Sequence, residues 1–282
     1  MIKNSELNPP VAKKLPQELE KHGDLRIDNY FWMKDREHPE VTNYLNAEND
    51  YCDVKMAHTK GFQTDLFEEM KSRIKEDDAS VPYKYNGYWY ISKYKKGKDY
   101  PIYTRKKDTL DNPEELLFDC NKMTEGASYF KLAGISISPD NKLVSYGIDT
   151  TGRRNYTIHI KNIETHEVAS DRIENTSGSS SWANDNKTLF YTKKDEQTLR
   201  AYQIYKHRLG DLKDDLIFEE GDDTFGVAVY KSKSRKYIII ACYSTLTNAY
   251  YILNADEPDG QFEVFHERIR GLEYSISHYN DH

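Results

Sequence analysis

A nine-residue pattern that occurs twice decides the fold. Residues 138–146 read SPDNKLVSY and residues 183–191 read ANDNKTLFY, at an offset of 45 residues. Each copy is a polar turn followed by an apolar or aromatic run, which is the pattern of a turn that leads into a β-strand. A weaker copy, KSKSRKYII, lies at residues 231–239. Residues 86–90, NGYWY, form a similar step from a polar turn into a strand. The chain therefore carries an internal repeat.

Repeats of roughly 40–50 residues with about four strands each are typical of β-propeller blades. About 200 residues follow position 80, which is enough for about four blades. The last blade is predicted to be incomplete, because residues 274–282 read like a turn that introduces another strand. A β-sandwich with similar hairpins is the alternative. The predicted strands are residues 83–94, 101–105, 135–138, 143–148, 156–162, 188–192, 203–208, 227–230, 237–243 and 249–254.

The first part of the chain has a different, helical periodicity. Residues 38–76 predict two amphipathic helices that are separated near Gly61, with Pro39 suited to a first helical position. The composition changes at residues 77–82, so we expect a helical segment over residues 1–79 and an incomplete propeller over residues 80–282. The apolar face of the second helix needs a partner. Its members are Phe62, Leu66, Phe67, Met70 and Ile74.

Composition excludes several classes of protein. The 40 basic and 47 acidic side chains give a net charge of -7, which argues against a nucleic-acid partner. The longest purely apolar run is residues 238–242, so neither a signal peptide nor a membrane span is expected. Cys52, Cys120 and Cys242 are odd in number and far apart, which argues against a disulfide framework and fits a reducing, cytoplasmic compartment.

Motifs for nucleophilic or metal chemistry are missing from these residues. The GxSxG elbow of α/β-hydrolases is absent, and its nearest approaches, residues 134–138 and 178–182, lack the second glycine and are interpreted as structural. His166 and His266 each precede a glutamate, but no second histidine follows at zinc-ligand spacing. We therefore assign no catalytic, cofactor-binding or metal-binding residue, and expect no cofactor.

Three histidines and four pairs of adjacent carboxylates are interpreted mainly as non-catalytic residues. Solvated or hydrogen-bonded roles are favoured for His58, His159 and His207. Adjacent carboxylates are interpreted mostly as solvated loop charges, although acidic side chains that face a propeller tunnel would favour cationic ligands. These pairs are Asp77-Asp78, Asp214-Asp215, Glu219-Glu220 and Asp222-Asp223.

Longer stretches carry a resemblance to a known family. Residues 23–36 (GDLRIDNYFWMKDR), 39–41 (PEV) and 44–49 (YLNAEN) resemble the N-terminal signature of the prolyl oligopeptidase family, and most closely its oligopeptidase B, or protease II, branch. The resemblance extends over nearly the whole chain. It continues through residues 80–83, 86–90, 97–103 and 149–157.

This resemblance implies a cytosolic-type serine peptidase that is considerably longer than the present chain. Its parts would be an N-terminal helical segment that packs on the hydrolase domain, a seven-bladed propeller, and a C-terminal α/β-hydrolase domain with a Ser, Asp and His triad. That triad would lie beyond residue 282, so no catalytic residue is carried over to this sequence. Members of the oligopeptidase B branch cleave short peptides after Arg or Lys.

Two interpretations follow. In the first, the chain is the helical segment plus about four of seven blades, it is inactive alone, and its propeller limits substrate size. In the second, the chain is a stand-alone, non-catalytic propeller-like module that binds a protein partner, which fits the absence of catalytic motifs. The second is less favoured, because the signature at residues 24–49 belongs to a peptidase whose N-terminal segment serves its catalytic domain.

Overall fold

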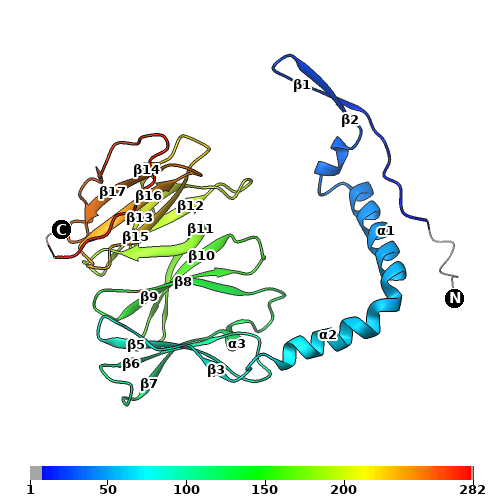
Figure 1. The fold of residues 1–282 in the computed structure, drawn as a ribbon. Helices are drawn as coiled ribbons and strands as arrows, with labels where there is room; N and C mark the ends of the chain where they lie inside the picture. The colour runs from blue at the N-terminus through cyan, green and yellow to red at the C-terminus, as the bar shows by residue number, and fades with distance from the viewer. Residues whose placement is uncertain (1–7, 281) are drawn as a thin grey trace. The chain divides into compact units, whose positions relative to one another are not determined.

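A computed structural model describes residues 8–280 and 282, which divide into two compact units (Figure 1). The first unit extends to Lys75 and the second runs from Glu76 to His282. Both contain β-strands, and the two long helices lie in the first. The structure is mainly β, as the sequence predicts.

The first unit consists of a hairpin followed by helices. His22 and Gly23 both have positive φ, as the two central residues of a tight type I′ hairpin turn require. Pro39 occupies the first turn of the long helix, and the His38 side chain accepts a hydrogen bond from the backbone N–H of Glu40. The two predicted helices are present, whereas the hairpin was not predicted. The elements are β1 (Gln17–Lys21), β2 (Asp24–Asp28), η1 (Phe31–Lys34), α1 (Pro39–Met56), η2 (Ala57–Thr59) and α2 (Lys60–Ser72).

The second unit is built from four successive antiparallel groups of strands, which we call blades 1 to 4. Blade 1 contains β3 (Asp78–Ala79), β4 (Tyr83–Tyr85), β5 (Tyr88–Tyr94), β6 (Ile102–Lys107) and β7 (Glu114–Asp119), and the short helix α3 (Cys120–Met123) follows it. Blade 2 contains β8 (Lys131–Ile137), β9 (Leu143–Asp149), β10 (Tyr156–Asn162) and the first part of β11 (Val168–Trp182). Blade 3 contains the second part of β11, β12 (Thr188–Lys194), β13 (Ala201–Arg208) and β14 (Asp215–Glu219). Blade 4 contains β15 (Gly226–Lys231), β16 (Tyr237–Tyr243), β17 (Asn248–Asn254) and β18 (Glu263–Val264).

The long strand β11 joins blades 2 and 3 into one seven-stranded sheet. It pairs with β10 from Val168 to Thr176 and with β12 from Thr176 to Trp182, so Thr176 is paired on both sides. Register shifts in both pairings mark the passage from one blade to the next.

The sequence repeat corresponds to the turn between the first two main strands of each blade. Asn86, Asn141, Asn186 and Arg235 stand at equivalent places and all have φ between 46° and 65°. Asparagine tolerates this left-handed conformation better than most residues. The repeated asparagines therefore reflect a backbone requirement of the turn.

The same turns are bonded to one another from blade to blade. The Asn86 amide donates to the Asn141 side chain at 3.1 Å, and the Asn186 side chain accepts from the backbone N–H of Asp140 at 2.8 Å. The Asn184 amide donates to the Arg235 carbonyl at 3.2 Å, and the Arg235 guanidinium donates to Asn86. These contacts link the turns of all four blades.

Three glycines allow blades 2 and 3 to approach closely. A Cβ atom added at Gly147 would lie 2.6 Å from the Cα of Gly178, and one added at Gly134 would overlap the Gly178 carbonyl. Gly134 and Gly178 also have positive φ. Because the obstacle at Gly147 is backbone and not a side chain, it has little freedom to move away.

We expect Gly147→Ala to destabilise the second unit by about 3 kcal/mol, because over-packing against backbone strains the contact between the blades. The urea midpoint of unfolding measures this effect. Gly221→Ala is the matched control, since nothing lies within 4 Å of its added Cβ, and it should leave the midpoint nearly unchanged. Equal midpoints for the two variants would contradict the close approach.

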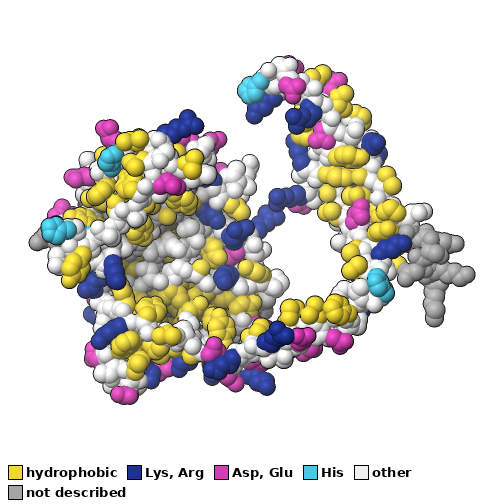
Figure 2. All heavy atoms as spheres, viewed as in Figure 1, with side chains coloured by type: hydrophobic (Ala, Val, Ile, Leu, Met, Phe, Trp, Pro, Cys, Tyr) yellow, Lys and Arg dark blue, Asp and Glu magenta, His cyan; other side chains and the backbone are white. Residues whose placement is uncertain are grey.

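The apolar face of α2 is exposed, with 68% of Phe62 and 58% of Phe67 accessible, and Ile74 just beyond the helix is 67% accessible. Figure 2 shows hydrophobic side chains along this part of the chain.

Residues 274–280, which were expected to introduce another strand, form no strand. Instead, the Tyr274 ring packs 5.0 Å from that of Tyr250, whose hydroxyl donates to the Tyr274 carbonyl at 3.0 Å. This segment therefore covers part of blade 4.

Candidate functional site

The first strands of blades 2, 3 and 4 line a cavity of about 480 Å³, whose surface we call the inner wall. Its side chains are small or hydroxyl-bearing at most positions. The lining residues are Gly134, Ile135, Ser136, Ser177, Ser179, Ser180, Ser181, Thr192, Ala201, Val227, Ala228, Val229, Tyr230 and Tyr243. They carry no charge, and none of the acidic pairs singled out in the sequence belongs to them.

One serine hydroxyl of the inner wall, that of Ser180, is hydrogen-bonded within the sheet. It lies 2.8 Å from the hydroxyl of Ser145, a buried residue of β9 that also donates to the Ser136 carbonyl at 3.3 Å. Neither of these serines is hydrogen-bonded to a histidine, which a serine nucleophile needs as its base. These hydroxyls can offer hydrogen bonds to a peptide, but they form no catalytic dyad.

A second cavity, of about 260 Å³, lies between blades 1 and 2, and we call it the tyrosine cavity. It is lined by Tyr83, Tyr90, Ile91, Ser92, Tyr103, Thr104, Leu117, Leu132, Ala133, Gly134 and Ile135. Gly134 and Ile135 also line the inner wall, so the two cavities meet at β8.

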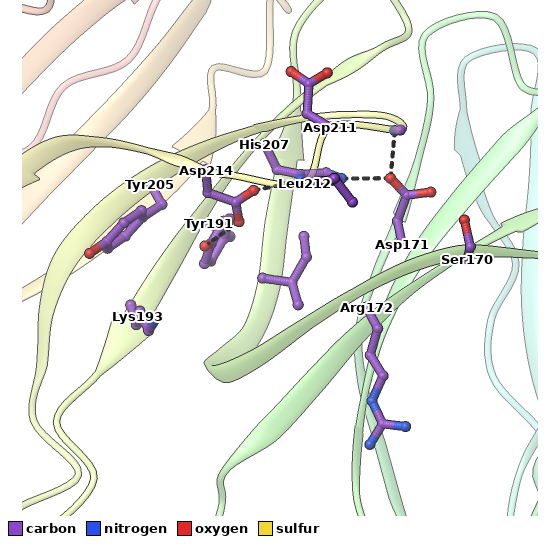
Figure 3. A pocket seen from close by; sticks show the side chains of 12 residues that line it. Ser170, Asp171, Arg172, Tyr191, Lys193, Tyr205, His207, Asp211, Leu212 and Asp214 are labelled. Carbon is purple, nitrogen blue, oxygen red and sulfur yellow. Dashed lines mark hydrogen bonds and ion pairs between the residues drawn. The ribbon is translucent and has the colours of Figure 1, made fainter.

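The third cavity, of about 500 Å³, contains a buried histidine between two carboxylates (Figure 3). His207 on β13 bonds through Nδ1 to Asp214 at 2.7 Å and through Nε2 to Asp171 at 2.9 Å. Tyr191 donates to Asp214 at 2.6 Å, and the backbone N–H of Gly210 donates to Asp171 at 2.7 Å. Because each ring nitrogen faces a carboxylate, the arrangement suits the doubly protonated imidazolium.

Burial and hydrogen bonding oppose each other at His207. Burial alone would lower its pKa, but the hydrogen bonds and charges of Asp214 and Asp171 outweigh it and raise the pKa above the usual 6.5. The same contacts hold the pKa of both aspartates below 3.8, although burial alone would raise it. The cluster is an ionic contact between blades 2 and 3, since Asp171 belongs to the part of β11 that pairs with β10. We call these three residues, Asp171, His207 and Asp214, the charged strut.

Comparison with known proteins places this architecture in a family. The family description "Prolyl oligopeptidase, N-terminal beta-propeller domain" matches residues 9–282. The chain belongs to the prolyl oligopeptidase family. The resemblance drawn from the sequence is thereby confirmed.

Relatives in the prolyl oligopeptidase family are similar over nearly all of this chain. Dipeptidyl aminopeptidase BI of Pseudoxanthomonas mexicana is 38% identical over 97% of the chain, and Protease 2 of Moraxella lacunata is 35% identical over 96%. The solved structure of oligopeptidase B from Leishmania major superimposes with a TM-score of 0.88 and 30% identity over 97% of the chain. The chain spans 40–41% of the length of these three proteins. The matched part is the N-terminal propeller portion of the family.

Several residues considered in the sequence lie outside the three cavities. The His159 ring stacks on Tyr146 at 5.6 Å, and His58 Nδ1 lies 3.0 Å from the Lys55 carbonyl. His166 and His266 are exposed. Among residues 8–280 and 282, no group of three or more His, Cys, Asp or Glu side chains could hold a metal ion. No helix in the described part of this propeller chain is long and apolar enough to cross a membrane.

The acidic pairs were interpreted mostly as solvated loop charges, and two of their members are exceptions. Asp214 joins the His207 cluster, and Glu220 is only 5% exposed and accepts hydrogen bonds from both terminal nitrogens of Arg268. Arg268 lies 48 residues from Glu220 along the chain, and Asp171 lies 36 residues from His207. No local spacing signals such pairings, because the propeller topology brings the residues together.

Replacing His207 tests the charged strut. His207→Gln is expected to destabilise the second unit by about 2–3 kcal/mol at pH 5.5, because it leaves two carboxylates without their cation. A raised folded pKa means that the stabilisation is fully present below pH 6.5 and is lost as the pH rises through the folded value. The difference between the urea midpoints of wild type and variant should therefore shrink by pH 9.

Exposed His266 provides the control for this experiment. His266→Gln should leave the urea midpoint close to that of the wild type at both pH values. A pH-independent gap for His207→Gln would mean that the imidazole acts by packing and not by charge.

Proposed function

We propose that this chain is the N-terminal segment and first propeller blades of an oligopeptidase B-like serine endopeptidase, and that the full-length protein hydrolyses short peptides after Arg or Lys. The observation that carries the proposal is the superposition on oligopeptidase B from Leishmania major at a TM-score of 0.88 over 97% of the chain. The net charge of -7 supports the preference for basic peptides through long-range attraction.

The chemistry is assigned to a C-terminal α/β-hydrolase domain with a Ser, Asp and His triad. Serine acyl transfer needs a nucleophile, a base and an oxyanion hole, and it needs no metal ion. The one hydrogen bond described for a serine hydroxyl of the inner wall joins Ser180 to Ser145 and not to a histidine, so the wall presents no paired nucleophile and base. The present chain is therefore expected to be inactive alone.

The helical segment, residues 1–79, is proposed to pack on that hydrolase domain. Its second helix exposes a row of apolar side chains that would lose water on docking. Burying such a row stabilises an interface at about 25 cal/mol per Å² of apolar surface. The propeller segment, residues 80–282, would cover the catalytic centre.

The propeller is proposed to act as a size filter, with peptide substrates in contact with its inner wall. The wall offers hydroxyl groups, small side chains and no charge, which suits an extended peptide backbone of any sequence. A folded protein is too wide for such a passage. The full-length enzyme is proposed to be cytoplasmic, which fits the three free cysteines.

Activity measurements test this proposal. The 282-residue chain should release no chromophore from an arginine-containing chromogenic peptide, whereas the natural protein that extends through its hydrolase domain should release it with sensitivity to a serine-directed inhibitor. The longer protein should cleave short Arg or Lys peptides but spare the same sequence inside a folded domain. Activity of the 282-residue chain that survives repurification, or cleavage of folded proteins, would contradict the proposal.

A further inference from the structure

The tyrosine cavity contains a polar group without a partner. Tyr90 lies on β5, pairs directly with Tyr83 and Arg105 on the neighbouring strands, and is 6% exposed. Its hydroxyl is buried and donates no hydrogen bond within the described residues. Burial raises its pKa to about 12, so the phenol keeps its proton.

The hydroxyl proton of Tyr90 requires an acceptor that its polar neighbour cannot provide. Arg105 lowers the pKa of Tyr90 through its charge and as a hydrogen-bond donor, but a guanidinium offers no acceptor for the hydroxyl proton. Arg105 is itself held by Glu115 at 2.7 Å and by the Asn141 carbonyl at 3.2 Å. A ligand that satisfies Tyr90 must therefore bring an oxygen acceptor.

The rest of the cavity selects an apolar group of limited size. Apart from Ser92, Thr104 and Gly134, its walls are tyrosine rings and aliphatic side chains. The Tyr83 and Tyr90 rings stack with their centroids 5.3 Å apart. Its volume of about 260 Å³ is below the roughly 300–1,000 Å³ of sites for drug-sized ligands. One bulky amino-acid side chain suits this space better than a complete cofactor.

The position of the cavity suggests how that side chain arrives. Gly134 and Ile135 line both the tyrosine cavity and the inner wall. Gly134 lies at an irregularity of β8 where the pairing with β9 shifts register, and β8 is the terminal strand of its sheet. A peptide that lies on the inner wall can thus place one side chain past β8.

We propose that the tyrosine cavity is a subsite for one aromatic or large aliphatic residue of a peptide bound at the inner wall, with Tyr90 donating its hydroxyl proton to a carbonyl oxygen of that peptide. This inference rests on the proposed function, in which peptides contact the inner wall. It adds a selectivity, for an apolar residue away from the scissile bond, that the hydrolase domain would not impose.

Binding to the 282-residue chain tests the subsite without any catalysis. The probes are acetyl-Gly-Phe-Gly-amide and acetyl-Gly-Ala-Gly-amide, titrated by NMR into protein with labelled tyrosines. The phenylalanine peptide should bind about tenfold more tightly than the alanine peptide and should shift the Tyr90 ring signals. Tyr90→Phe should weaken binding of the phenylalanine peptide about fivefold.

The matched control is Tyr85→Phe, in the same strand group but outside the cavity lining, which should leave both affinities unchanged. The urea midpoint of Tyr90→Phe should equal or exceed that of the wild type, because the variant removes an unpartnered buried hydroxyl. A lower midpoint would show that the hydroxyl has an internal acceptor and would overturn the proposal.

Equal affinity for the two peptides, no binding of the phenylalanine peptide, or an unchanged affinity in Tyr90→Phe would also overturn the subsite. Such a failure is separable from failure of the proposed function. Cleavage of Arg peptides by the longer protein is measured independently of peptide binding to the 282-residue chain. If the longer protein failed to cleave these peptides, the measured binding preference would still stand.

Discussion

Trp182 connects three consecutive blades, and the propeller segment depends on contacts of this kind. It ends β11, and only 2% of it is exposed. Its indole N–H donates to the Ser136 carbonyl of blade 2 at 3.0 Å, and its own carbonyl accepts from Lys231 of blade 4 at 2.8 Å. A four-stranded sheet cannot bury both faces by itself, so each blade is stable only against its neighbours.

This constraint also determines where function can be located. The blades pack through large apolar side chains, in one cluster that spans blades 1 and 2 and another that spans blades 3 and 4. The first strands of blades 2 to 4 carry small and hydroxyl-bearing residues, which leave an uncharged wall. The glycine contact at Gly147 and the His207 strut both join blades 2 and 3, where strand β11 is shared. Architecture and candidate ligand contacts therefore depend on the same strands.

Much of the fold was predictable from local signals. The repeated asparagine turns mark a backbone conformation that recurs in every blade. Strand β16 is a continuous apolar run, and in β10 the apolar Ile158 and Ile160 alternate with polar residues. β7 and β14 were missed because they are short and begin and end with acidic residues. β11 was missed because it is serine-rich and contains Asp171, Asn175 and Gly178, residue types that are depleted in strands. In that strand, pairing with β10 and then with β12 overrides propensity.

The candidate sites were less predictable, because they depend on contacts between distant residues. The inner wall, the tyrosine cavity and the His207 cluster each combine residues from at least two blades.

We propose above that this chain is the non-catalytic front of a serine peptidase, and the sharpest test is to sequence the natural gene beyond the codon for His282. We expect an open frame with further blades and then a GxSxG elbow followed by Asp and His. A natural stop codon directly after His282 would contradict it.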